Sequence, residues 1–164
     1  MKNFILAALI LPLFLIGCNS PQKEENQVGI ITGDDFRSKA AFKFTDAYVN
    51  NDLDSVADLF TPDAKIMVND TDLTFSQMAA GFSIGHEYFT DIRHEKNDAF
   101  TMHYKEGDNA GSIFTHYWYN WKATSKKTGK ELSIRGYAWM KWRGDKVEIM
   151  YNAFDPTLYN ASLD

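Results

Sequence analysis

The chain has 164 residues, 45% hydrophobic and 24% charged, which is enough for one domain with one sizeable core. Its net charge of −5 and its four scattered histidines give no basic face, so a nucleic-acid-binding protein is not supported. A single cysteine excludes an intrachain disulfide and a zinc site with several cysteine ligands. The aromatic content of 15% is the unusual value.

The first 20 residues, MKNFILAALILPLFLIGCNS, have the layout of an export signal. Lys2 precedes an apolar run from Phe4 to Ile16, which is too short to span a bilayer comfortably as a permanent helix. The run ends in Leu-Ile-Gly-Cys, which resembles the lipobox of bacterial lipoproteins. The resemblance implies a signal peptide at 1–17 and acylation, including palmitate, at Cys18. A cleaved secretory peptide that ends near a cysteine by chance is the alternative.

Residues 18–33 are polar, and we expect them to form a flexible tether before a domain at 34–164. Asn19 stands where an aspartate would resemble an inner-membrane retention signal of enterobacteria, so we expect an outer-membrane protein of the cell envelope. The segment KEE at 23–25 resembles surface-export signals of Bacteroidetes lipoproteins, but charge clusters are also common in tethers. Both the periplasmic face and the cell surface stay open.

The first half of the domain carries the apolar periodicity of helices. It predicts, in chain order, helices at 34–50 and 53–60, a short strand at 65–69 and a third helix at 74–95. His86 lies on the apolar stripe of the third helix, between Phe82 and Phe89. His94 falls at its polar end, where we expect a solvated side chain.

The second half has the pattern of strands separated by glycine-containing turns. We expect strands at 98–105, 112–123, 131–142 and 147–154. Helices followed by strands predict an α+β domain in which the helices pack on one face of an antiparallel sheet.

The order of these elements and the segment NDLDSVADLFTPDAKIMV at 51–68 resemble the nuclear transport factor 2-like superfamily. This superfamily includes SnoaL-like polyketide cyclases, steroid isomerases and scytalone dehydratase. The resemblance covers about residues 34–158 and implies a cone-shaped domain, a curved antiparallel sheet with three helices packed on its concave face. The steroid isomerase pattern would place its oxyanion-stabilising tyrosine at Phe44 and its general base at Val68. Neither phenylalanine nor valine can transfer a proton, so steroid isomerisation with the family's residues is not expected.

The turn KKTGK at 126–130 decides which face each aromatic side chain of the next strands occupies. A three-residue loop with Gly129 in the left-handed conformation pairs Lys126 with Lys130. The side chains that it turns toward the helices are Phe114, His116, Trp118 and Asn120. A two-residue loop, Thr128-Gly129, exchanges the faces. The site prediction rests on the three-residue loop.

A two-residue loop at Gly144-Asp145 then sends Tyr151 and Asp155 inward. The predicted ligand-binding residues are His86, His116, Trp118, Asn120, Tyr151 and Asp155. His116 and Asp155 are candidate acid–base residues, because histidine titrates near neutral pH and a carboxylate can set its tautomer. A packed histidine and an aspartate that caps the last strand are the alternatives.

The opposite face collects aromatic side chains beside Arg135 and Lys141, and an exposed patch of this size usually marks an interaction site. The predicted interface residues are Tyr117, Tyr119, Trp121, Tyr137 and Trp139. Because superfamily members often dimerise through this side of the sheet, we expect a homodimer. Stacking on sugar rings and coverage by the chain's own termini are the alternatives.

We therefore expect an exported lipoprotein, anchored to a membrane through Cys18, whose domain binds a small, mostly apolar ligand without catalysis. One alternative is an isomerase, cyclase or dehydratase that uses His116 and Asp155, and another is a dimeric protein-interaction module. No metal site is expected, because no pair of histidines has helical ligand spacing, and no cofactor is expected.

Overall fold

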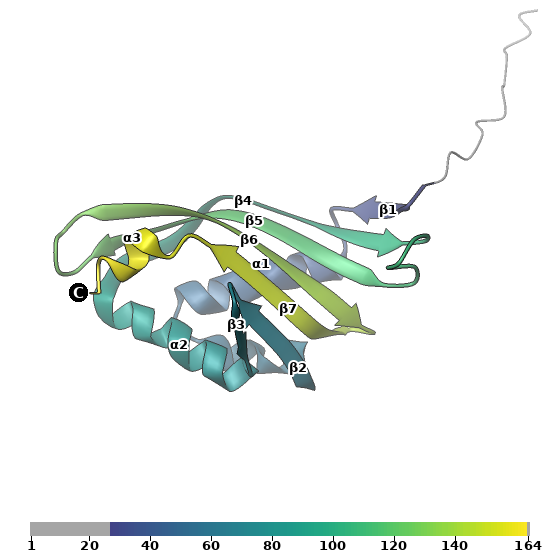
Figure 1. Ribbon diagram of the computed structural model, residues 1–164, viewed down its shortest axis with the longest axis horizontal. Coiled ribbons are helices and arrows are strands. Elements are labelled where there is room, and N and C mark those ends of the chain that lie inside the picture. Colours follow the sequence, from purple (N-terminus) through teal and green to yellow (C-terminus); the bar gives the residue numbers. More distant parts are fainter. Residues whose placement is uncertain (1–26, 164) are drawn as a thin grey trace, which may run out of the picture.

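In the computed structural model, which describes residues 27–163, one curved seven-stranded sheet carries the main helices on one face (Figure 1). The strands are β1 (Gly29–Thr32), β2 (Phe60–Val68), β3 (Thr71–Leu73), β4 (Phe89–Tyr104), β5 (Ile113–Ser125), β6 (Glu131–Arg143) and β7 (Lys146–Phe154). The helices are α1 (Phe36–Val49), the 3-10 helix η1 (Leu53–Leu59), α2 (Phe75–Tyr88) and the short α3 (Thr157–Asn160).

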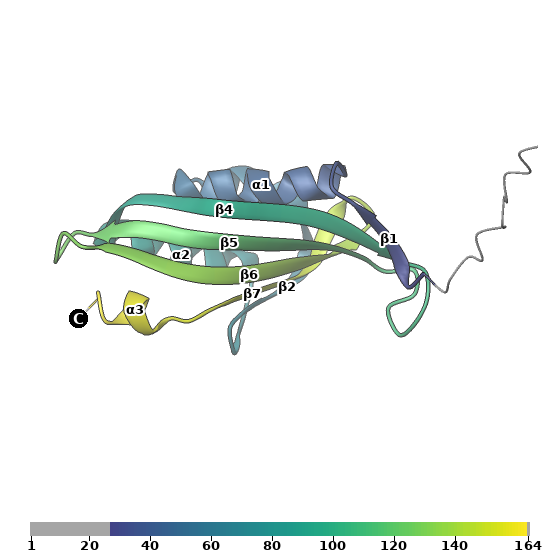
Figure 2. The ribbon, with the colours of Figure 1, turned by 90° about the horizontal axis from the view of Figure 1, so that it is seen from above.

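The strands lie in the order β1-β4-β5-β6-β7-β2-β3, and neighbours are antiparallel except for the parallel pair β2 and β7. Seen from above, the long strands β4, β5 and β6 extend across α1 and α2 (Figure 2). The most deeply buried aliphatic side chains come from both layers, for example Val56, Ile66 and Val147 at 1% exposure. The predicted α+β class, with helices on one face of a curved sheet, is confirmed.

Local capping explains where the two long helices begin. Asp35 precedes α1, and its carboxylate accepts a hydrogen bond from the Arg37 backbone N–H at 2.8 Å. Thr74 and Gln77 form a capping box at the start of α2, in which each side chain accepts a hydrogen bond from the other residue's backbone N–H.

The third predicted helix is too long. α2 ends at Tyr88, and residues 89–95 begin β4 instead. Phe89 is 2% exposed, and its ring packs against those of Trp121 and Tyr159. These contacts come from distant parts of the chain and outweigh the local helical periodicity. His94 therefore lies on a strand and not at a solvated helix end.

The β5–β6 hairpin has a four-residue loop, 126–129, and the predicted register is wrong by one residue. The Ser125 N–H donates to the Lys130 carbonyl at 2.9 Å, and His116 lies opposite Trp139. Because a shift of one residue exchanges the faces of a strand, the expected sides of β5 are reversed. The side chains that face the helices are Thr115, Tyr117, Tyr119 and Trp121.

A contact with α2 explains this longer loop. Lys126 donates its backbone N–H to the Tyr88 carbonyl and its Nζ to the His86 carbonyl, both at 2.9 Å. The last carbonyls of a helix lack partners within the helix, so Lys126 satisfies them and leaves the strand ladder. Gly129 has a φ of +67°, the left-handed conformation that the sequence predicts.

The β6–β7 hairpin has the predicted two-residue loop, but a bulge just beyond it reverses the side chains that follow. Met150 and Asn152 are buried toward the helices, at 2% and 6% exposure. Tyr151 faces away and packs against Trp139 on β6. Asp155 follows the strand and is exposed. The inward direction predicted for Tyr151 and Asp155 is therefore wrong.

Residues 29–32, which the sequence places in the tether, form the edge strand β1 and pair with β4. The folded part thus begins before the predicted boundary at residue 34. The predicted signal peptide at 1–17, the acylation of Cys18 and the start of the tether lie outside the described residues. None of the helices between residues 27 and 163 has the length and hydropathy of a membrane-spanning segment.

Candidate functional site

A cavity of about 380 Å³ lies between the sheet and the helices α1 and α2. The inward faces of β4 to β7 line one side, and the helices, the β2–β3 hairpin and the C-terminal segment line the rest. Most of the lining is apolar, and it includes Phe44, Met78, Phe82, Met140 and Met150. Among the described residues, no aspartate, glutamate, lysine or arginine lines it. This size and lining are typical of small-molecule sites.

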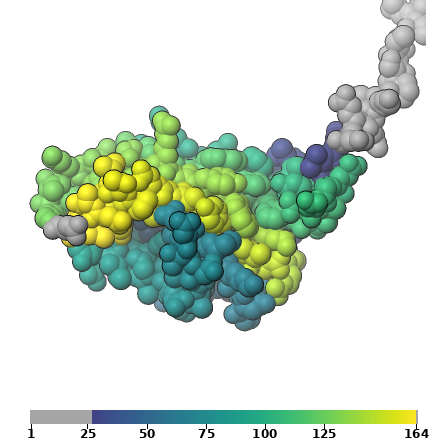
Figure 3. Space-filling model, viewed as in Figure 1, coloured from purple at the N-terminus to yellow at the C-terminus, as the bar shows by residue number. Residues whose placement is uncertain are grey.

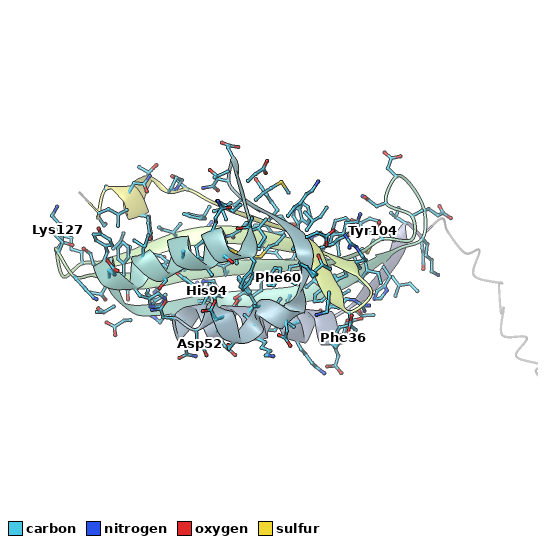
Figure 4. All side chains as sticks on the ribbon, turned by 90° about the horizontal axis from the view of Figure 1, so that it is seen from below. Phe36, Asp52, Phe60, His94, Tyr104 and Lys127 are labelled. Carbon is cyan, nitrogen blue, oxygen red and sulfur yellow. The ribbon has the colours of Figure 1, made fainter. Side chains whose placement is uncertain are left out.

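His94 on β4 lies on the side of the sheet that faces the helices, and it lines the cavity (Figure 4). Its ring stacks on Tyr119 with centroids 4.2 Å apart, and its Nδ1 lies 3.0 Å from the Tyr117 hydroxyl. Two residues with left-handed backbone bracket it, Asp91 at φ +53° and Lys96 at φ +48°, where the β4–β5 register shifts. Each costs about 1–2 kcal/mol for a residue other than glycine. The strand thus stores strain on both sides of His94.

The electrostatic surroundings of His94 keep its ring neutral. Burial lowers its pKa from 6.5 to about 4. The Tyr117 hydroxyl accepts a hydrogen bond from Asn97 Nδ2 at 3.3 Å, and a phenol is a stronger acid than a neutral imidazole. We therefore assign Tyr117 as the donor to His94 Nδ1, which leaves the ring proton on Nε2.

Tyr119 and Asn152 form a second polar pair in the cavity lining. The Tyr119 hydroxyl donates to Asn152 Oδ1 at 2.7 Å, and burial raises the pKa of Tyr119, so the phenol stays protonated. Gly136 lies opposite Tyr119 on β6, and a Cβ at this position would overlap the Tyr119 ring. Glycine at 136 therefore makes room for the ring.

Tyr48 on α1 supplies the third polar group. Its hydroxyl oxygen accepts a hydrogen bond from Trp121 Nε1 at 2.8 Å, and burial raises its pKa. The rings of Phe82 and His94 pack beside it, with centroid distances of 5.4 Å and 5.7 Å. Since the indole N–H can only donate, the hydroxyl proton of Tyr48 is left for another acceptor.

The edge of the cavity involves α2 and the C-terminal segment. Gly81 is exposed and lines the cavity, and a Cβ there would meet no atom within 4 Å. Tyr159 of α3 also lines the cavity, and a Cβ at Gly85 would lie 2.8 Å from its hydroxyl oxygen. Glycine at 85 therefore lets Tyr159 approach α2. Figure 3 shows the C-terminal segment, in yellow, beside the teal β2–β3 hairpin.

The described residues offer neutral hydrogen-bonding groups and no metal centre. Within 27–163, no group of three or more His, Cys, Asp or Glu residues is placed to hold a metal ion. The cavity can therefore hydrogen-bond an uncharged ligand, and the pair of His94 and Tyr117 can transfer a proton within it.

The predicted acid–base residues lie elsewhere. His116 is on the outward side of β5, where its Nδ1 lies 2.6 Å from the Tyr137 hydroxyl. Asp155 is exposed, and its Oδ1 accepts a hydrogen bond from the Thr157 N–H at 2.9 Å. Among the described residues, neither side chain hydrogen-bonds the other, so the expected pair does not form.

The other predicted ligand residues also lie away from the cavity lining. Trp118 is 41% exposed on the outward side, and Asn120 accepts a hydrogen bond there from the Ser133 hydroxyl at 3.0 Å. Tyr151 shares that side. His86 Nε2 donates to the Tyr48 carbonyl at 2.9 Å and so ties α2 to α1.

The predicted interface is divided between the two faces. Tyr117, Tyr119 and Trp121 line the cavity, whereas Tyr137 and Trp139 point outward as expected. The outward rings form a patch that we call the outer aromatic face, consisting of Phe100, Phe114, His116, Trp118, Tyr137, Trp139 and Tyr151. Its rings stack on one another, for example His116 on Tyr137 at an interplanar angle of 10°. The outward side of the sheet therefore remains the candidate interaction surface.

The residues that the sequence interpretation missed are His94, Tyr48 and Asn152. Tyr48 and Asn152 were not among the predicted ligand-binding residues, although the predicted first helix and last strand contain them. For His94 a local signal exists, because Ile92 and His94 alternate with polar residues at the spacing of a strand. The longer helical pattern before them conceals it.

No family model and no curated protein sequence matches the chain. AclR from Streptomyces galilaeus, a proposed hydroxylase, is 15% identical with a TM-score of 0.58 over 77% of this chain and 95% of that chain. A proposed SnoaL-like polyketide cyclase from Shewanella denitrificans OS-217 is 12% identical with a TM-score of 0.54 over 78% and 96%. A de novo designed protein with a curved β-sheet is 11% identical with a TM-score of 0.51 over 77% and 90%.

At these identities the likeness concerns the fold alone. Natural proteins with different proposed activities and a designed protein share it, so the fold does not select one function. The chain has the fold of the SnoaL-like polyketide cyclases, the cone-shaped fold of the nuclear transport factor 2-like superfamily.

Proposed function

We propose that the domain binds a small, uncharged and mostly apolar molecule in the cavity between the sheet and the helices. The observation that carries this proposal is a cavity of about 380 Å³ whose apolar lining is interrupted by a few neutral polar groups. A charged ligand would lose its hydration there without meeting an opposite charge, which is unfavourable. An uncharged ligand gives up little hydration energy on entering the cavity and gains apolar contact there.

Binding without chemical change is the simplest use of this lining. A general base works best when its pKa lies near the operating pH, and His94, with a pKa of about 4, is a weak base. Among the described residues, no carboxylate lines the cavity to assist it.

Gly81 offers a way to test the proposal. In Gly81→Leu, the new side chain enters the cavity without a backbone clash, and leucine favours a helix more than glycine by nearly 1 kcal/mol. We expect this variant to fold and to lose binding of lipid-extract components in native mass spectrometry. Ala80→Leu is the matched control, because Ala80 is the exposed neighbour of Gly81 on α2 and faces a different groove. Equal binding by the two variants would contradict the proposal.

A second candidate function is acid–base catalysis by His94 and Tyr117. The strained residues on both sides of His94 favour it, since such strain is concentrated at active sites. It predicts that the protein accelerates α-proton exchange of 2-tetralone in deuterium oxide, followed by NMR, and that His94→Phe removes the acceleration. Exchange at the buffer rate in the wild-type protein would eliminate this candidate.

We also propose that the protein is exported and anchored to the cell envelope, with the outer membrane as the expected site. The support is the Leu-Ile-Gly-Cys sequence behind an apolar segment. Cells that express the protein should incorporate labelled palmitate into it, and Cys18→Ala should abolish the label. Persistence of the label in the variant would refute acylation at this residue.

Self-association is proposed through the outer aromatic face. A contiguous apolar patch with polar side chains around it is typical of protein interfaces. Its ring pairs range from nearly parallel, such as His116 and Tyr137 at 10°, to edge-on, such as Phe114 and Trp139 at 61°.

A further inference from the structure

Exposed apolar side chains gather beside the opening of the cavity. Gly81 marks this opening, because it is exposed and also lines the cavity. Ile84 and Tyr88, both exposed, follow Gly81 at spacings of three and four residues, so the three share one side of α2. The buried residues of α2 lie on another side of the helix, and water-facing positions are usually polar. Core packing therefore does not explain these two side chains.

The short helix α3 adds a third exposed apolar side chain, Leu158. Its neighbour Tyr159 lines the cavity and lies against Gly85 of α2. Both helices thus border the cavity, near the end of the domain where the β5–β6 loop lies (Figure 1). We call Ile84, Tyr88 and Leu158 the apolar rim. They are three of the eight exposed large apolar side chains among the described residues, so the grouping exceeds isolated surface exposure.

A basic loop adjoins the apolar rim. Lys126 and Lys127 lie in the β5–β6 loop and Lys130 follows it, and all three are exposed. Lys126 bonds the last carbonyls of α2, which places the loop at the C-terminal end of that helix, with Lys127 at the tip of the hairpin (Figure 4). The lysines therefore stand beside the apolar rim.

The acidic residues near this end do not outnumber the lysines within residues 27–163. Glu131, which follows the loop, belongs to a cluster of two glutamates, Arg93 and Lys122, whose charges cancel. Glu87 and Asp91 are the exposed acidic residues next to the end of α2. The three lysines give this end its basic character, in a chain whose total charge is −5.

We propose that the apolar rim and the basic loop dock on the surface of a bilayer with anionic headgroups, from which an apolar ligand enters the cavity. Exposed apolar side chains flanked by lysines are typical of interfacial membrane binding. A protein docked here would cover the opening, whereas a bilayer offers the ligand an apolar path without a step through water. The inference rests on the proposed binding function for its purpose and names the surface that supplies the ligand.

The docking end lies opposite the end where the N-terminal chain enters the sheet. β1 pairs with the last residues of the long strand β4, whereas the basic loop follows the strand paired with the first residues of β4 (Figures 1 and 2). Ile31 on β1 is 61% exposed and Ile84 is 51% exposed. Ile31 is therefore a matched apolar position at the far end of the domain.

A single fluorophore can report which end meets the bilayer. Because the chain has one cysteine, Cys18→Ala removes the proposed acyl anchor and the only native thiol. In this background, an environment-sensitive fluorophore on Leu158→Cys should be quenched by phosphatidylglycerol vesicles with brominated acyl chains. The same fluorophore on Ile31→Cys should be quenched much less. Any attachment through the apolar N-terminal segment is common to both proteins.

Variants of the docking surface separate its two contributions. Lys127→Gln and Lys130→Gln should each weaken vesicle affinity about fivefold at low salt, and neither should change the affinity for phosphatidylcholine vesicles. Ile84→Gln should reduce the quenching at position 158, whereas Ile31→Gln should not. Glutamine favours a helix at least as well as isoleucine, and circular dichroism checks the fold.

The outcomes separate docking from ligand binding. No quenching at position 158, or quenching that Ile84→Gln and the lysine variants leave unchanged, would overturn the docking inference. A fluorescence change at position 158 that depends on protein concentration without vesicles would also overturn it, by assigning the rim to a second copy of the chain. If docking fails while the wild-type protein retains a lipid-extract molecule that Gly81→Leu loses, the cavity function stands alone. Quenching at 158 with no molecule retained would support docking and contradict the cavity function.

Discussion

Gly136 provides a quantitative test of the way the sheet holds the cavity residues. A Cβ at this position would overlap two ring carbons and the hydroxyl oxygen of Tyr119, which lies directly opposite on β5. Overpacking of this kind costs about 1–3 kcal/mol, and loss of the Tyr119 hydrogen bond to Asn152 adds about 1 kcal/mol. Gly136→Ala should therefore lower the free energy of unfolding by about 2–4 kcal/mol.

Gly136→Ala should instead raise the free energy of unfolding when the Tyr119 ring is absent. In a Tyr119→Ala background no clash exists, and alanine is better than glycine in a strand by about 0.5–1 kcal/mol. Urea denaturation of wild type, both single variants and the double variant gives the coupling energy. A cost of Gly136→Ala that is similar in both backgrounds, or below about 1 kcal/mol in the wild type, would show that Gly136 is not needed to make room for Tyr119.

Three further predictions concern strain, protonation and assembly. Lys96→Gly should raise the free energy of unfolding by about 1 kcal/mol in urea denaturation, because glycine adopts φ +48° without strain, and a loss would contradict the strained geometry beside His94. Because burial lowers the pKa of His94 from 6.5 to about 4, its contribution to stability is complete above pH 6.5 and falls by up to about 3 kcal/mol as the pH drops to 4. Urea denaturation at pH 7 and pH 4.5 should show a smaller difference for His94→Phe than for wild type, and an equal difference would argue against a buried neutral ring. Trp139→Lys should convert a dimer to a monomer in light scattering, whereas a wild-type protein that is already monomeric would remove the dimer proposal.

The fold was predictable because its signals are local. The helix at the start of the domain follows from apolar spacing behind Asp35, and the segment 51–68 resembles the corresponding part of the superfamily. The four long strands of the second half follow from composition and from glycines at their turns. These features depend on neighbouring residues, which a single sequence displays.

The faces of the aromatic strand were not predictable, because they depend on one tertiary contact. The loop glycine was placed correctly, and Gly129 does have a positive φ. Lys126, however, bonds the carbonyls at the end of α2 and lengthens the loop by one residue. This one-residue difference turns Tyr117 and Tyr119 toward the helices and His116 and Trp118 away from them. The predicted site therefore fell on the wrong face of the sheet.

The position of His94 was missed for a related reason. Its strand begins directly after α2, where Phe89 packs on Trp121 and Tyr159 from later parts of the chain. Two bulges in β4, one on each side of His94, then set the direction of the His94 ring. No local pattern encodes such contacts, because each joins segments that are far apart in the sequence.

Native mass spectrometry of the protein after incubation with a lipid and metabolite extract is the direct test of ligand binding in the cavity. We expect a bound, uncharged, mostly apolar molecule on the wild-type protein, its loss in Gly81→Leu and its retention in Ala80→Leu. A wild-type protein that retains no molecule, or a molecule that Gly81→Leu retains equally well, would contradict binding in this cavity.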